Sequence, residues 1–214
     1  MTSPNEYNPL DYQNLTKHCV DELMRRGPFE LPLEQDFFGA GVYALFYTGD
    51  DPVYAKIRSP DAEWPIYVGK AVPPGGRKGG GKPAAQSKSL SGRLAEHTAS
   101  IKAASNLSID DFLCRYLVVT PLWITMAERF LIEHYLPLWN IGMDGFGNHD
   151  PGSGRHAGEI TWWDALHPGR SWAKKLSQTK TPASAQAHLK KLLANYETTP
   201  KAVSLEDIEP HEDE

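Results

Sequence analysis

Two short apolar runs constrain the fold of this chain more than any other feature of its sequence. Residues 42–47 and 65–69 each contain a tyrosine among apolar residues, and each is flanked by glycine or proline. This pattern is typical of short buried strands, and the turn residues 48–52 reverse the chain between them. The sequence therefore predicts two joined strands on which Tyr43 and Tyr67 lie close together.

Hydrophobic periodicity predicts the remaining elements. Residues 112–120 are rich in aromatic and β-branched side chains, which favours a third strand, and residues 53–57 are expected to extend the hairpin. Helical spacing of apolar residues predicts four helices, at residues 8–26, 89–104, 122–136 and 183–196. Ser89 or Ser91 is expected to cap the second of them. With 40% hydrophobic residues, a chain of this length can bury one core and is expected to form one domain.

Charge is distributed unevenly along the chain. The net charge is −5, yet residues 70–102 contain seven basic residues and one acidic residue. A second, weaker basic segment runs from Arg155 to Lys175, whereas residues 1–36 and 201–214 are acidic. Because local fields steer a polyanion to a surface, the basic middle of the chain favours DNA binding despite the negative net charge.

Residues 71–88 form a segment of glycine, proline, lysine and serine that cannot bury a core. One interpretation is a solvated loop without a role. The other is a loop that folds onto a phosphate backbone, because it connects the second predicted strand to a helix with further candidate residues. The second interpretation assigns DNA contacts to the basic residues in and beside the segment, Lys70, Arg77, Lys78, Lys82 and Lys88.

Three polar residues on the predicted helices are candidates for chemistry. Arg93 and His97 lie four residues apart and therefore on one face of their helix. Glu128 falls within the apolar stripe of the helix at residues 122–136, and a carboxylate directed at a core is costly unless it is paired, protonated or bound to a metal. A buried partner such as Arg115 is one explanation and a metal site is the other. The nearby Arg-x-x-x-His pair favours the metal site.

These elements together carry a resemblance to a known family. They occur in a fixed order along the chain: GVY at residues 41–43, YVGKA at 67–71, the Arg-x-x-x-His helix, the helix with an inward glutamate, and Asn140. In this order they resemble the catalytic domain of the GIY-YIG nuclease superfamily, with valines in place of two isoleucines and a long basic insertion. The resemblance covers residues 41–142. It implies an α+β fold with a small three-stranded antiparallel sheet flanked by helices.

The resemblance also implies the chemistry, which is hydrolysis of a phosphodiester bond. Glu128 would hold one divalent cation per active site, Mg²⁺ or Mn²⁺, and Arg93 would neutralise the phosphate. There are two alternatives to a restriction endonuclease. One is a repair or homing nuclease, and the other is a DNA-binding module that keeps the fold without cutting.

The remaining residues would act on the attacking water. Tyr43 would be the general base, and because an unperturbed phenol has a pKa of about 10, neutral His97 would accept its proton. Tyr67 would hydrogen-bond within the same cluster. Asn140 would hold either Tyr43 or the region of Glu128 in place.

The segment 143–175 is dense in glycine, histidine, arginine and tryptophan. With the insertion, it resembles the branch of type II restriction endonucleases that cut GC-only palindromes, which implies CCGCGG as the expected target. His149, Arg155 and Arg170 are candidate DNA contacts, because an arginine can bind O6 and N7 of guanine. A packing loop anchored by tryptophans is the alternative, and a histidine-rich metal site is a further one.

The expected partner is double-stranded DNA. Cutting both strands of a palindrome predicts a homodimer on DNA, and the restriction branch implies a cognate DNA methyltransferase as a companion without direct contact. No run resembles a signal peptide or a membrane span, and Cys19 and Cys114 lie in apolar contexts. A cytoplasmic location with free thiols and no membrane contact is therefore expected.

The single domain, residues 1–214, is expected to have four parts. They are an N-terminal helix and wrap at 1–40, a catalytic core with the basic insertion at 41–142, a DNA-recognition extension with the C-terminal helix at 143–200, and an acidic tail at 201–214. Its composition predicts disorder for the tail.

Overall fold

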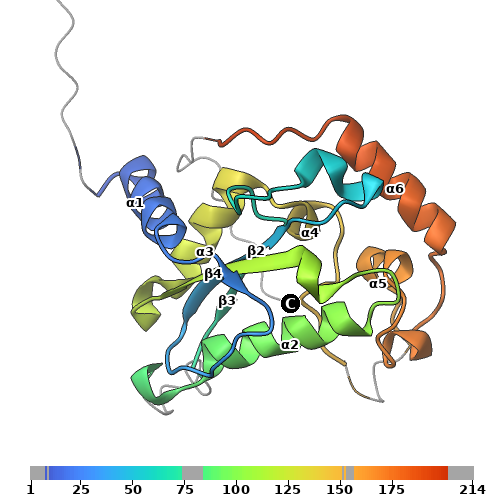
Figure 1. The fold of residues 1–214 in the computed structure, drawn as a ribbon, viewed down its shortest axis with the longest axis horizontal. Helices are drawn as coiled ribbons and strands as arrows, with labels where there is room; N and C mark the ends of the chain where they lie inside the picture. Colours follow the sequence, from blue (N-terminus) through green and yellow to red (C-terminus); the bar gives the residue numbers. More distant parts are fainter. Residues whose placement is uncertain (1–7, 9, 74–83, 151, 153–156, 202–214) are drawn as a thin grey trace, which may run out of the picture.

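An antiparallel sheet of four strands in the order β1-β4-β2-β3 forms the centre of the fold (Figure 1). The structure is a computed structural model that describes residues 8, 10–73, 84–150, 152 and 157–201. β2 (Gly41–Tyr47) pairs with β3 (Tyr67–Ala71) on one side and β4 (Phe112–Val118) on the other. The two-residue β1 (Phe29–Glu30) extends the sheet beyond β4. β3 is therefore an edge strand.

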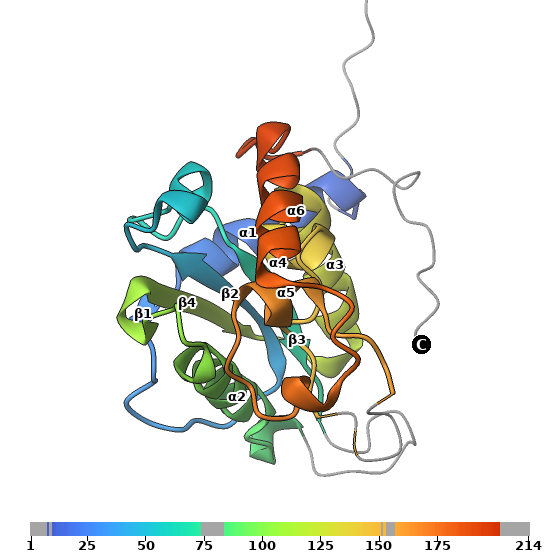
Figure 2. The same ribbon diagram turned by 90° about the vertical axis from the view of Figure 1, so that its right-hand side faces the viewer.

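Helices cover both faces of this sheet because β2 is apolar along its whole length. All seven of its residues are buried, the pattern of a strand with packing on both sides. One face, with Tyr43 and Leu45, packs against α2 (Ser89–Ala103). The other face packs against α1 (Tyr12–Met24) and α3 (Pro121–Tyr135) (Figures 1 and 2).

The C-terminal third extends the core beyond the sheet. The tryptophans of α4 and α5 and the leucines of α6 join the cluster that contains Tyr43, and α6 lies against α5 (Figure 2). The helices of this third are α4 (Leu138–Ile141), α5 (Trp162–Leu166) and α6 (Pro182–Ala194). The short 3-10 helices are η1 (Pro52–Ile57), η3 (Ala84–Gln86), η4 (Ile109–Asp111) and η6 (Ala173–Lys175). Residues 41–142 and the extension after them thus share one core.

The predicted α+β class with its antiparallel sheet and flanking helices is confirmed, and the short β1 adds a strand to the three expected. The expectation that residues 53–57 extend the hairpin is wrong. The side chain of Asp51 accepts a hydrogen bond from the backbone N–H of Val53, 2.8 Å away, and Pro52 follows it, so the segment begins a 3-10 helix.

Two finer expectations also differ from the structure. The predicted serine cap of α2 is wrong, since Lys88 occupies the N-cap position and its side chain makes no capping hydrogen bond. Ser91 instead donates to the carbonyl of Phe37, 3.0 Å away. The first predicted helix starts later than expected because Asp11 caps it, which leaves Leu10 exposed.

Cys19 and Cys114 are free thiols, as expected. Within the described residues, no helix is long and apolar enough to cross a membrane.

Candidate active site

Two tyrosines on neighbouring strands form the centre of the candidate site. The ring centroids of Tyr43 on β2 and Tyr67 on β3 lie 6.2 Å apart, as the strand pattern predicts. Tyr43 is opposite Gly69 in the pairing register, and a Cβ atom at Gly69 would lie 2.6 Å from Cζ of Tyr43. Only glycine therefore leaves room for the phenol to lie across β3.

The hydroxyl of Tyr43 is hydrogen-bonded to Nε2 of His97 at 2.6 Å, and both side chains are buried. Burial, and next the neighbouring Tyr67, raises the pKa of Tyr43 well above its ordinary value. Burial, together with the charge of Arg93, lowers the pKa of His97 well below its ordinary value. Both groups are therefore neutral near pH 7, and in the tautomer that carries its proton on Nδ1 the imidazole accepts the tyrosine hydroxyl proton at Nε2.

Phe146, from the segment after α4, closes this pocket. Its ring stacks on His97 with centroids 4.5 Å apart and an interplanar angle of 17°, and it meets Tyr67 edge-on at 4.9 Å. Its neighbour Gly147 also approaches closely, since a Cβ there would lie 2.6 Å from the hydroxyl of Tyr67. The extension thus forms one wall of the pocket that holds the tyrosines.

Arg93 lies one helical turn before His97 and bridges the pocket to the surface. Its guanidinium donates to Oε2 of Glu96 at 2.8 Å and to the carbonyl of Gly147 at 2.6 Å, and it contacts the ring of His149. Its side chain is 19% exposed. A cavity of about 320 Å³ opens here, lined by Arg93, Glu96, His149 and Lys70 among others. The cationic head can therefore reach a ligand that enters this cavity.

Glu128 on α3 forms a salt bridge with Lys70 on β3, with Nζ and Oε2 2.9 Å apart. The expected alternative partner is wrong: Arg115 donates to the backbone carbonyls of Ala62, Met24 and Arg26. Glu128 is not in the core, since its side chain is 18% exposed. It is near enough for its charge to contribute to the raised pKa of Tyr67, which burial dominates.

The residues present fit a divalent cation with few protein ligands. In the part of the chain that the structure describes, no group of three or more His, Cys, Asp or Glu residues could hold a metal ion. Mg²⁺, however, commonly binds through one or two carboxylates and keeps several waters or takes substrate phosphates. A single partly exposed carboxylate at Glu128, near the tyrosines, matches that requirement.

Asn140 acts on the edge of the sheet. Its side-chain Oδ1 accepts from the backbone N–H of Val68 and its Nδ2 donates to the carbonyl of the same residue, each at 2.8 Å. The amide thus pairs with β3 as a neighbouring strand would. It fixes the backbone between Tyr67 and Gly69 and contacts neither Tyr43 nor Glu128 through these bonds.

Arg170, a predicted reader of guanine, is buried, so in this structure its guanidinium is not exposed to a base. It is 4% exposed and forms a salt bridge with buried Asp164 at 2.6 Å. It also lies 4.6 Å from the ring centroids of Trp163 and Trp172. Its remaining N–H groups donate to three carbonyls of the segment that carries Phe146, those of Gly145, Phe146 and Asn148.

This cluster was missed by the sequence reasoning, although its signal was present. An acid six residues before an arginine, among tryptophans, is the composition of a buried ion pair with aromatic walls as much as of a DNA contact. The alternative of a packing segment anchored by tryptophans describes Asp164 and Arg170 correctly.

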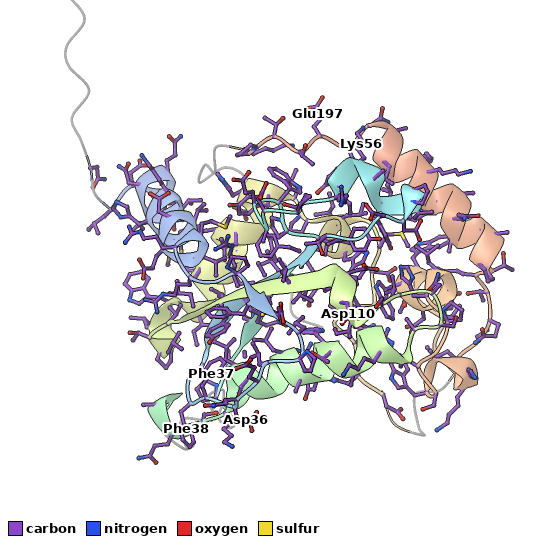
Figure 3. All side chains as sticks on the ribbon, in the orientation of Figure 1. Asp36, Phe37, Phe38, Lys56, Asp110 and Glu197 are labelled. Carbon is purple, nitrogen blue, oxygen red and sulfur yellow. The ribbon has the colours of Figure 1, made fainter. Side chains whose placement is uncertain are left out.

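The other predicted DNA contacts lie in different places. Lys88 pairs with Asp36 at 3.0 Å, beside the exposed ring of Phe38 at the start of α2 (Figure 3). His149 is largely exposed and contacts Arg93. Four predicted contacts lie outside the described residues: Arg77, Lys78, Lys82 and Arg155.

Tyr43 pairs with Gly69 in the antiparallel sheet, next to Tyr67, and α2 presents Arg93 and His97. These features are those expected of a GIY-YIG nuclease domain. The sequence pattern of the family described as the Eco29kI GIY-YIG domain matches residues 35–196. The chain therefore belongs to this family of type II restriction endonucleases, which confirms the predicted resemblance. Its domain is that of a DNA endonuclease acting on double-stranded DNA. Among curated proteins, none matches the chain.

Proposed function

We propose that this protein is a sequence-specific type II restriction endonuclease that cuts a GC-rich palindrome, CCGCGG, with one divalent cation per active site. The observation that carries the proposal is the buried hydrogen bond between Tyr43 and neutral His97, beside a cavity with Arg93 on its wall. A neutral imidazole that is hydrogen-bonded to a phenol can accept the phenol's proton.

Proton transfer would run along this pair. As the water oxygen bonds to phosphorus, Tyr43 takes its proton and passes its own hydroxyl proton to Nε2 of His97, so the pair gains one positive charge. The bond between phosphorus and the leaving oxygen breaks, and the leaving oxygen takes a proton from solvent. Burial disfavours the protonated imidazole, and product release would return the proton to solvent. Tyr67 and Phe146 exclude water from the pair.

Charge neutralisation would come from Arg93 and from the cation held by Glu128. When bound, Mg²⁺ or Mn²⁺ would stabilise negative charge on the phosphate oxygens and lower the pKa of a bound water. Arg93 would exchange Glu96 and His149 for the phosphate, which is the stronger bidentate acceptor. Asn140 would keep β3 rigid so that Tyr67 and Gly69 hold Tyr43 in position.

DNA recognition would rest on the basic side of this cavity. Lys70, Lys88 and His149, with Arg77, Lys78, Lys82 and Arg155 from the chain beyond the described residues, are the proposed contacts. The extension at residues 143–200 is the proposed recognition part. A palindrome favours a homodimer on DNA. A cytoplasmic location and a cognate methyltransferase as a companion belong to the same proposal.

A cleavage assay with a matched control tests the proposal. Purified protein is incubated with Mg²⁺ and a plasmid that contains CCGCGG, and the cut ends are sequenced. Tyr43→Phe should lower the single-turnover rate by about 10²-fold or more. Tyr116→Phe is the control, since Tyr116 is the register partner of Tyr43 on the neighbouring strand β4 and its ring stacks on two phenylalanines. It should cut at the wild-type rate.

Three results would overturn the proposal. Cleavage at many unrelated sites would indicate a repair-type nuclease, and tight DNA binding without cutting would indicate a binding module. Equal rates for Tyr43→Phe and the wild type would remove Tyr43 from the mechanism.

A further inference from the structure

The carboxylate proposed to hold the metal already holds a cation from the protein itself. Nζ of Lys70 lies 2.9 Å from Oε2 of Glu128, and the two side chains are 28% and 18% exposed. This partial burial leaves the pair less screened than a pair in open solvent. Any cation that binds Glu128 must therefore compete with the ammonium group.

Lys70 lies at the edge of the sheet, between Glu128 and the cavity that contains Arg93. Side chains alternate along β3, so Lys70 points away from the face of Tyr67 and Gly69 and toward α3. Because β3 is the edge strand of the sheet, Lys70 also lies on the wall of the cavity that contains Arg93. Its flexible four-carbon stem allows the ammonium group to turn between the two sides of this edge.

Arg93 shows the same arrangement. Its guanidinium is paired with Glu96 at 2.8 Å inside the same cavity. Among the described residues, the three lysines and arginines that line the cavity, Lys70, Lys88 and Arg93, are thus each paired with a carboxylate of the protein. Charge in the free site is balanced internally, and binding of a metal and a phosphate must exchange these pairs.

We infer that Lys70 occupies the cation position of Glu128 in the free protein and moves to a DNA phosphate when a divalent cation replaces it. The inference rests on the proposed function, because it takes Glu128 as the metal ligand. A phosphate gives the displaced ammonium a new anionic partner, so DNA lowers the cost of displacement. Metal and DNA then tighten each other's binding by the same factor, as linkage requires. Lys70 is in this sense a positioning residue that couples the two ligands.

Cation binding measured without DNA tests the inference directly. The probe is Ca²⁺, which takes the same oxygen ligands as Mg²⁺, titrated by calorimetry into the full-length protein. Lys70→Met removes the competing ammonium and keeps most of the stem. It should tighten Ca²⁺ binding by about fivefold or more, the scale of losing one partly screened ion pair. Glu128→Gln should abolish this binding.

Lys88→Met is the matched control. Lys88 lines the same cavity but pairs with Asp36 rather than Glu128. Its loss removes one positive charge from the region without freeing the proposed ligand, so Ca²⁺ affinity should change by less than about twofold.

The second measurement is the coupling itself. Binding of a duplex of about 30 base pairs containing CCGCGG is followed by fluorescence anisotropy with and without Ca²⁺. The cation should strengthen DNA binding of the wild type by a factor of about 5 to 150, and this factor should fall in Lys70→Met. An unchanged factor would overturn the inference.

The outcomes separate the inference from the proposed function. If Lys70→Met binds Ca²⁺ as the wild type does while Glu128→Gln does not bind it, the exchange is refuted and the metal ligand stands. If Glu128→Gln binds Ca²⁺ with wild-type affinity, the metal assignment of Glu128 fails and the inference fails with it.

Discussion

Replacing Arg170 with methionine tests whether this residue organises the active-site segment or reads DNA. Methionine keeps an unbranched, polarizable stem between Trp163 and Trp172 and removes the guanidinium. The change leaves Asp164, whose side chain is 1% exposed, without its charged partner. It also removes the donors to the carbonyls of Gly145, Phe146 and Asn148.

The expected loss of stability follows from this geometry. Removing one partner of a buried, hydrogen-bonded ion pair costs about 3 to 5 kcal/mol. For a chain of this size, 1 kcal/mol corresponds to about 2 to 4 °C in melting temperature. The Arg170→Met protein should therefore melt about 6 to 20 °C below the wild type. Adding Asp164→Leu should cost little more, because the carboxylate that the first change leaves unpaired is then gone.

Thermal denaturation followed by circular dichroism measures the effect. Arg25→Met is the control, because Arg25 pairs with Glu22 on the surface with its side chain 75% exposed. That change should shift the melting temperature by less than about 2 °C. The Arg170→Met protein should also cut more slowly well below its melting temperature, because Phe146 and Gly147 support His97 and Arg93.

The result that would refute this reasoning is a stable Arg170→Met protein. A melting temperature within about 2 °C of the wild type, with cleavage at altered sequences, would return Arg170 to the role of a base reader.

Three further predictions concern Glu128, Gly69 and the buried histidines. The free energy of unfolding of the Glu128→Gln protein should lie within about 1 kcal/mol of the wild-type value, since its partner Lys70 is partly exposed. The variant should bind DNA without cutting it. A loss of stability of about 3 to 5 kcal/mol would instead show a structural ion pair. Gly69→Ala should cost about 1 to 3 kcal/mol and slow cleavage, because the added Cβ displaces Tyr43. Gly92→Ala, where a Cβ in α2 meets nothing within 4 Å, should be neutral or stabilising, so equal melting temperatures for the two alanine variants would contradict this account. Burial lowers the pKa of His97 well below its ordinary value and that of His167 to about 3. In acid, the unfolded chain therefore binds protons that the folded chain does not. The free energy of unfolding should fall as the pH drops below about 6.5. His167 alone should contribute a loss of about 2 kcal/mol at pH 5, and urea denaturation at pH 7 and pH 5 measures it; equal stability at the two values would show that these histidines titrate normally.

The same shifts shape the pH dependence of cleavage. Because Tyr43 must give up a proton whose pKa burial raises, the single-turnover rate should keep rising between about pH 7 and pH 9. Loss of activity by protonation of His97 should occur only below about pH 6.5. Rates measured across this range in constant ionic strength check both limbs, and an acid midpoint near pH 7 would contradict a buried, neutral His97.

Local order along the chain determined much of this protein. The strands that carry Tyr43 and Tyr67 and the helix that carries Arg93 and His97 could be predicted because each depends on apolar periodicity and spacing within a few residues. Membership of the family followed from the order of these short motifs. None of this required knowledge of distant contacts.

Tertiary structure decided the partners of the charged residues. Glu128 pairs with Lys70 and not with Arg115, and Asn140 binds the backbone of Val68. Arginine is a residue type common in DNA contacts, but Arg170 is buried among residues that precede and follow it in the chain. An ionic or hydrogen-bonded partner is chosen by which groups the folded backbone brings within about 3 Å. Sequence spacing constrains that distance within one helix or strand, and between elements only their packing sets it.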